Sequence, residues 1–157
     1  MYGVPKCQID RLQKVLNAAS RVTQHVPRYS HLTPALKSLH WIPIGFRIEF
    51  KIALLVFKAL KGMAPLNPEL IVILTLLNLS RMLQPKPTSR YFLRNNNETL
   101  LIIPQTRCKT FGDRAFAVAG PKIWNSLPLH IRETENLHNF KNKLKTHLFK
   151  EAFYKEQ

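Results

Sequence analysis

The sequence KTFGDRAFAVAGPKIWNSLP, residues 109–128, is expected to decide how this chain folds. Phe111, Ala115 and Ala119 recur at every fourth position, which places them along one side of a helix. Alanine has a small side chain, so this side of the helix allows a second element to approach closely. We therefore expect a packing element here rather than a loop that carries a reactive group.

Gly120 and Pro121 interrupt this helical pattern. Proline disfavours the interior of a helix but suits its first turn. The sequence thus predicts a helix that ends at Gly120 and Pro121, a second short helix that contains Trp124, and a turn over residues 125–128. We expect Trp124 to lie in the core. The alternative is that it stacks on a nucleic-acid base beside the basic side chains of the stretch.

Outside this stretch, helices are predicted over residues 8–26, 33–39, 45–61 and 136–153. Two β-prone runs, residues 91–94 and 99–103, flank an Asn-rich segment that favours a turn, which predicts a small β-hairpin. The expected fold class is mainly α, an irregular bundle of four or five helices with one small β-hairpin. We expect a single domain over residues 1–157, made of N-terminal helices (1–62), a divergent connector (63–88), the hairpin and helix-turn (89–128), and a C-terminal amphipathic helix (129–157).

The segment 45–61 is apolar on most sides but basic on one. Arg47, Lys51, Lys58 and Lys61 fall within an arc of about 80° on a helix, and no carboxylate interrupts this basic stripe. Two explanations stay open: the stripe keeps a largely buried helix soluble, or it contacts phosphate groups. The candidate nucleic-acid-binding residues of the chain are Arg47, Lys51, Lys58, Lys61, Arg107, Lys109 and Arg114.

The charge of the chain indicates the class of partner. The 157 residues contain 24 Lys and Arg against 9 Asp and Glu, a net charge of +15, and the excess is spread over both halves. A folded protein that is basic over most of its surface attracts polyanions, and nucleic acid is the commonest large one. The alternative is a protein that is merely basic. We expect RNA or an RNA–DNA duplex as partner, and neither a membrane nor a small-molecule substrate.

The cysteines and the N-terminal residues bear on the compartment. Cys7 and Cys108 lie far apart and form no C-x-x-C pair, so we expect reduced thiols in an intracellular protein, nuclear or cytoplasmic. The first residues, MYGVPKCQIDR, lack the apolar segment of a signal peptide. The apolar run LIVILTLLNL at residues 70–79 is shorter than the roughly 18 residues of a membrane span, which favours a buried helix or strand.

The sequence carries no pattern that is typical of a catalytic or metal site. Carboxylates are scarce, and no D-x-D or D-D pair is present to hold the ions of a two-metal phosphoryl-transfer site. Glu133 and Glu135 fall near a predicted helix start, where acids favour the helix dipole. The six His lack metal-ligand spacing, and no phosphate-binding Gly-rich motif occurs. We therefore expect no enzyme activity, no cofactor and no metal.

Four segments resemble the C-terminal end of one protein family. They are RLQKVLNAASR, HLTPALKSLHWIPIGFRIEFKIALLVFKALKGMAP, LLIIPQTRCKTFGDRAFAVAGPKIWNSLPLHIR and FKNKLKTHLF. In this order they are similar to the RNA-directed DNA polymerases of non-LTR retrotransposons, the LINE-type CR1, L2 and jockey-like elements. The resemblance covers nearly the whole chain, from about Tyr2 to Phe153; residues 66–88 depart from the family pattern.

The resemblance implies a non-catalytic C-terminal segment of such a polymerase. In this family the palm carries an aromatic-x-Asp-Asp motif that binds two metal ions, and no such motif stands in this chain. The implied role is to assist RNA or RNA–DNA binding through phosphate contacts. One alternative is a structural or interaction module that docks on upstream polymerase domains. Another is an inactive transposon relic with no function of its own.

Overall fold

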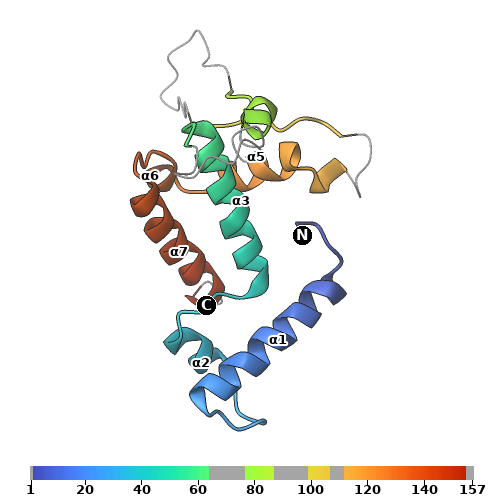
Figure 1. Ribbon diagram of the computed structural model, residues 1–157, viewed down its shortest axis with the longest axis vertical. Coiled ribbons are helices and arrows are strands. Elements are labelled where there is room, and N and C mark those ends of the chain that lie inside the picture. The colour runs from blue at the N-terminus through green and yellow to red at the C-terminus, as the bar shows by residue number, and fades with distance from the viewer. Residues whose placement is uncertain (1, 64–76, 87–98, 107–111, 155–157) are drawn as a thin grey trace. The chain divides into compact units, whose positions relative to one another are not determined.

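The computed structural model of the chain describes residues 2–63, 77–86, 99–106 and 112–154, and this part is mainly helical (Figure 1). The predicted mainly α fold class is confirmed. The chain divides into two compact units, which we call the terminal unit (Met1–Phe50 with Lys143–Gln157) and the central unit (Lys51–Asn142). The expectation of a single domain stays a prediction, and the two units are described separately.

The terminal unit begins with α1 (Lys6–Gln24), the amphipathic helix predicted from periodicity. Helix α1 ends where His25 adopts a left-handed backbone conformation with φ 50°. Arg21, in the last turn, donates hydrogen bonds to the carbonyls of Pro27 and Ser30. This side chain therefore fixes the turn that follows the helix and leads to α2 (Thr33–Ser38).

Helix α3 (Ile44–Leu60) starts in the terminal unit and ends in the central unit. The first N–H groups of a helix have no partner within it. At the start of α3, the N–H of Ile44 donates to Oε1 of Gln13 on α1, at 2.9 Å. A polar side chain on α1 thus caps the next long helix, 31 residues along the chain.

Aromatic side chains join α2 and its following turn to the end of α7 (Leu137–Tyr154) in the terminal unit. The His40 and Phe149 rings stack with 5.6 Å between their centroids. The Lys37 ammonium lies 4.4 Å from the centroid of the Tyr154 ring, within the range of a cation–π interaction. These contacts hold the C-terminal turns of α7 against residues near position 40.

The core of the central unit is formed by α3, α5 (Phe116–Ser126) and the start of α7. Phe57 and Phe140 stack with 4.1 Å between ring centroids, and the Trp124 ring lies 6.0 Å from that of Phe140. All three side chains are at most 3% exposed. The prediction that Trp124 is a core residue is confirmed, so it is not available to stack on a base.

Helix α5 corrects the predicted break at Gly120 and Pro121. A single helix runs through both residues, although Pro121 can donate no backbone hydrogen bond. Both residues are buried, and a Cβ atom added to Gly120 would lie 3.0 Å from Cγ2 of Val56 on α3. The close approach of α3 at Gly120 outweighs the local preference to break. The predicted helical side of Phe111, Ala115 and Ala119 is not one helix: Ala115 is the N-cap of α5, with an extended ψ of 140°, and Phe111 lies outside the described residues.

The predicted β-hairpin is also corrected. Residues 91–98 lie outside the described part of the chain, and residues 99–103 form no strand. Leu101 makes one isolated antiparallel bridge with Pro85 instead, and no strand occurs among the residues that the structure describes. The N–H of Lys86 donates to the Leu100 carbonyl at 2.9 Å, and that of Ile102 to the Gln84 carbonyl at 2.8 Å. The β-prone run thus has its partner at 84–86.

Several short helical segments complete the central unit. They are residues 77–82, η1 (Gly112–Arg114) and α6 (Leu129–Arg132). The described part of the chain therefore holds more helical elements than the four or five predicted. The C-terminal helix was predicted within one residue at each end, and its N-cap is Asn136, whose side chain accepts the N–H of His138 at 2.8 Å.

Candidate nucleic-acid interface

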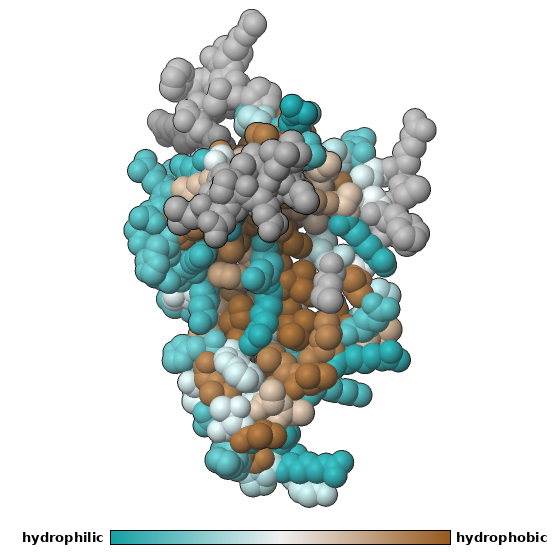
Figure 2. Space-filling view, viewed as in Figure 1, coloured by the Kyte–Doolittle hydropathy of each residue, from teal (hydrophilic) through white to brown (hydrophobic). Residues whose placement is uncertain are grey.

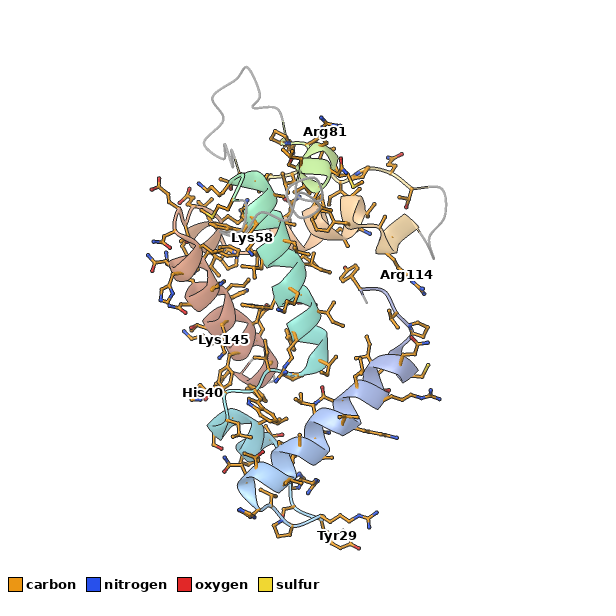
Figure 3. All side chains as sticks on the ribbon, viewed as in Figure 1. Tyr29, His40, Lys58, Arg81, Arg114 and Lys145 are labelled. Atoms are coloured by element: carbon orange, nitrogen blue, oxygen red, sulfur yellow. The ribbon has the colours of Figure 1, made fainter. Side chains whose placement is uncertain are left out.

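Three lysines of the basic stripe lie in the central unit. Lys51 and Lys61 are exposed and Lys58 is half-buried. None of the three makes an ion pair with a residue that the structure describes. Figure 3 shows Lys58 on α3. Their opposite side is the buried side of α3, where Ala53, Val56 and Phe57 are at most 1% exposed, so packing of the helix turns the lysines outward.

Arg47, the fourth residue of the stripe, belongs to the terminal unit and is engaged locally. Its Nε–H donates to the Ile42 carbonyl at 2.9 Å, and its guanidinium lies 5.8 Å from the centroid of the Trp41 ring. These two contacts fix the chain just before α3. Arg47 is therefore a weaker candidate for phosphate binding than the three lysines, because a phosphate would compete with contacts that it already makes.

The other three candidates are Arg107, Lys109 and Arg114, and the structure describes only Arg114 among them. It is exposed at the end of η1, where Figure 3 labels it. Arg107 and Lys109 lie outside the described residues. Lys122, another basic residue of the segment 109–128, forms an ion pair with Asp113 at 3.4 Å.

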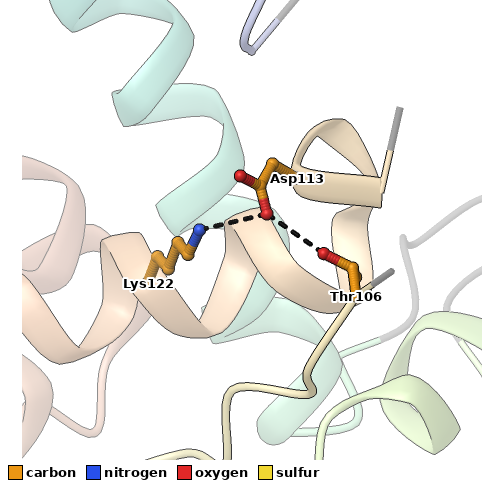
Figure 4. A network of polar contacts seen from close by, with 3 residues as sticks. All are labelled: Thr106, Asp113 and Lys122. Atoms are coloured by element: carbon orange, nitrogen blue, oxygen red, sulfur yellow. Dashed lines mark hydrogen bonds and ion pairs between the residues drawn. The ribbon is translucent and has the colours of Figure 1, made fainter. Parts of the chain in front are cut away.

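Asp113 holds two parts of the central unit together (Figure 4). Its Oδ1 accepts from the Thr106 hydroxyl at 3.2 Å and from the Lys122 ammonium at 3.4 Å. A Cβ added to Gly112 would lie 2.6 Å from Cβ of Thr106, so η1 touches the Thr106 side chain directly. This cluster is a structural contact between η1, α5 and residue 106, and it neutralises one of the basic side chains.

Side chains of α5 hold the segment 99–102 by its backbone. The Trp124 indole N–H donates to the Thr99 carbonyl at 2.7 Å. The Asn125 amide accepts from the Leu101 N–H at 2.9 Å and donates to the Leu101 carbonyl at 2.8 Å. An Asn side chain can pair in this way with both backbone groups of one residue, as a neighbouring strand would. Residues 123–126 (IWNS) of α5 thus position the segment that carries Leu101.

Arg132 is a buried cation that the sequence analysis did not single out. Its side chain, on α6, is 7% exposed, and it donates to the Leu127 carbonyl at 3.0 Å and to the Thr99 hydroxyl at 2.9 Å. Burial lowers the pKa of Arg132, and the charge of Glu133 opposes this effect. Its place at the end of LPLHIR, directly after Ile131, was the only local signal that it lies inside.

Within the described ranges, no group of three or more His, Cys, Asp or Glu side chains is placed to hold a metal ion. No helix of this part of the chain has the length and apolar character to cross a membrane. No family model, no curated protein and no solved structure matches the chain.

Proposed function

We propose that the chain is a non-catalytic module that binds RNA or an RNA–DNA duplex through backbone phosphates, as its resemblance to the end of LINE-type reverse transcriptases implies. The observation that carries the proposal is the position of Lys51, Lys58 and Lys61 in the central unit. Their places on the helical wheel fall within about 80°. None has an acidic partner among the described residues.

Unpaired lysines on one side of a helix suit phosphate contact for electrostatic reasons. A lysine that already pairs with a carboxylate must lose that partner before it binds a phosphate, and none of these three has such a partner among the residues that the structure describes. The lysine ammonium is a compact charge without the planar fork of arginine, so it favours phosphate without selecting a base. The proposal therefore predicts affinity with little sequence preference and a steep dependence on salt.

The test is the salt dependence of RNA binding by the full chain, measured by fluorescence anisotropy with a labelled RNA hairpin. The triple variant Lys51→Gln, Lys58→Gln, Lys61→Gln should bind more weakly than the wild type. If each lysine neutralises one phosphate, the slope of log K against log salt should become less steep by roughly 2 to 3. Arg47 is left unchanged because its loss would also disturb the start of α3.

A matched control separates the lysines from net charge. Lys6, Lys14 and Arg28 are exposed residues of the terminal unit, and their replacement by Gln removes the same three charges. The control variant should keep most of the wild-type affinity and slope. Equal losses in the two variants would show that net charge alone attracts RNA, and full binding by the Lys51, Lys58, Lys61 variant would show that the stripe is only solvated surface.

A second candidate function, a module that docks on other protein domains, is supported by apolar side chains left on the surface. On α1, Val15 is 68% exposed and Val22 is 76% exposed. Figure 2 shows hydrophobic residues exposed among hydrophilic ones on the viewed face. When a partner covers exposed apolar groups of this kind, their removal from water lowers the free energy and favours association. Salt-independent association with upstream polymerase domains, together with unchanged RNA binding in the lysine variant, would favour this function.

A further inference from the structure

The central unit contains a pocket of about 220 Å³ beside the segment 99–101. Its apolar walls come from Phe57 and Leu60 of α3, from Leu101, and from Trp124 of α5. An apolar cavity of about 150 Å³ is large enough to hold one benzene ring. This pocket therefore has room for one ring, or a branched aliphatic group of similar size, with a small polar substituent.

Arg132 supplies the charge of the pocket, which it lines together with Thr99. Its guanidinium has five N–H donors and stays protonated in proteins. The two hydrogen bonds to described residues, to Leu127 and Thr99, go to neutral oxygens. No carboxylate of the described residues lies within ion-pair distance of it. The nearby charge of Glu133 favours the charged form of Arg132 only in part, because burial still lowers its pKa. A buried cation without an ion-pair partner among the described residues is unfavourable, and an anion in the pocket would relieve this.

The hydrogen bonds of Arg132 also have a structural role, because they join α6 to the end of α5 and to Thr99. That role accounts for two of its five donors and explains why the side chain is held in place. It does not require a positive charge, since both acceptors are neutral. A rigidly held guanidinium at an apolar pocket is the arrangement that recognises a carboxylate attached to an apolar group.

We propose that this pocket binds a small organic acid, in which one carboxylate pairs with Arg132 and one apolar ring or branched group lies against Phe57, Leu60 and Leu101. Lys61, also at the pocket, adds a second positive charge that attracts the acid. The proposal does not depend on RNA binding, because the buried Arg132 and the apolar walls hold the ligand; of the stripe lysines, only Lys61 lines the pocket.

Binding can be followed through Trp124, which lines the pocket. The chain contains two Trp, so Trp41→Phe leaves Trp124 as the single fluorescent tryptophan. Benzoate added to this variant should change Trp124 fluorescence in a saturable way. Benzamide, which has the same shape without the charge, should bind at least about tenfold more weakly, because its neutral amide cannot form an ion pair with Arg132. Phenyl phosphate serves as a third probe.

Three results would overturn the proposal. They are an absence of saturable change with benzoate, equal binding of benzamide, and binding of phenyl phosphate without benzoate. Arg132→Gln should abolish the benzoate response while benzamide is unaffected. That variant also loses a structural contact, so its thermal unfolding has to be measured beside it.

A pair of leucine variants tests the pocket without touching Arg132. Leu60 lines the pocket and is 40% exposed, whereas Leu55, on the same helix, is 39% exposed and does not line it. Leu60→Glu places a negative charge at the pocket and should weaken benzoate binding at least about tenfold. Leu55→Glu makes the same change in net charge and should leave binding nearly unchanged. Equal effects of the two substitutions would contradict the proposal, even if Arg132→Gln fails to fold.

Discussion

Helix α1 has 19 residues with regular apolar spacing, whereas α5 has 11 residues with a glycine and a proline at its centre. By intrinsic propensity α1 is the better helix. Burial follows the opposite order. Val15 and Val22 of α1 are largely exposed, while Val118, Ile123 and Trp124 of α5 are at most 7% exposed. In this chain, therefore, packing rather than helix propensity decides which segment organises a core.

The largest expected effect is the loss of the α5 anchor. Trp124→Ala removes a buried ring, its contact with Phe140 and its hydrogen bond to Thr99. We expect the free energy of unfolding to fall by roughly 3–5 kcal/mol, measured by urea titration with far-ultraviolet circular dichroism. Tyr29→Ala removes an aromatic ring that is 95% exposed and should change stability by less than about 0.5 kcal/mol. A similar fall in the free energy of unfolding for Trp124→Ala and Tyr29→Ala would contradict the role of Trp124 as a core anchor.

The same substitution in α1 and in α5 tests whether burial sets the contribution of each helix to stability. Val118 of α5 is 2% exposed and Val22 of α1 is 76% exposed. Val118→Ala should lower the free energy of unfolding by roughly 2 kcal/mol, since it leaves a cavity. Val22→Ala should be neutral or slightly stabilising, because alanine has the higher helix propensity. Thermal unfolding of the two variants under the same conditions measures the difference, and a larger loss in the α1 variant would reverse our conclusion.

A pair of glycine substitutions should give effects of opposite sign. Gly120→Ala would place its Cβ 3.0 Å from Val56, which is fully buried and β-branched, so we expect a loss of about 1–3 kcal/mol. Gly45→Ala, near the start of α3, meets no atom within 4 Å and should stabilise the chain by roughly 0.4–1 kcal/mol. Unfolding midpoints in urea give the signs. Stabilisation by both substitutions would show that α3 and α5 are less closely packed than described.

The smallest expected effect depends on pH and concerns the terminal unit. Burial raises the pKa of Glu49 above its ordinary value of 4.5, and the charge of Glu151 raises it further. The folded state then holds this proton more tightly than the unfolded state, so ionisation of Glu49 at neutral pH is destabilising. Glu49→Gln should stabilise the chain at pH 7 by about 0.2–1 kcal/mol, a modest value because Glu49 is only half-buried.

The advantage of Glu49→Gln should disappear as the pH falls below the ordinary pKa of glutamate, because Glu49 is then protonated in both states. Urea titrations at several pH values measure this. Glu135→Gln, which removes the same charge from an exposed side chain, reports the general effect of net charge. A gain of Glu49→Gln that is equal at all pH values would contradict the assignment.

The sequence allowed the long helices to be predicted because their signals are local. Apolar periodicity and cap residues placed α1, α3 and α7 within about two residues, and Gly62, with φ 59°, follows α3 as expected for a helix stop. What could not be predicted depends on residues distant in sequence. The continuity of α5 through Pro121 requires α3, and the pairing of Leu101 with Pro85 requires a segment that shows no strand pattern.

The same distinction applies to the candidate site. The basic stripe is a property of one helix, so its lysines were found from spacing alone. The engagement of Arg47 by Ile42 and Trp41, and the burial of Arg132 beside Thr99, arise from the path of the backbone around them. No local sequence pattern distinguishes an arginine that donates to a carbonyl inside the protein from one whose guanidinium is available to bind a phosphate.

The paired hydrogen bonds of Asn125 make one amide nitrogen important for the chemical ageing of this protein. Slow hydrolysis of that amide to a carboxylate would replace the donor to the Leu101 carbonyl with an oxygen, and two oxygens would then face each other across 2.8 Å. The segment 99–102 would loosen without any change elsewhere in the sequence. Aged or Asn125→Asp protein should therefore show faster hydrogen exchange at the Leu101 amide than fresh protein does.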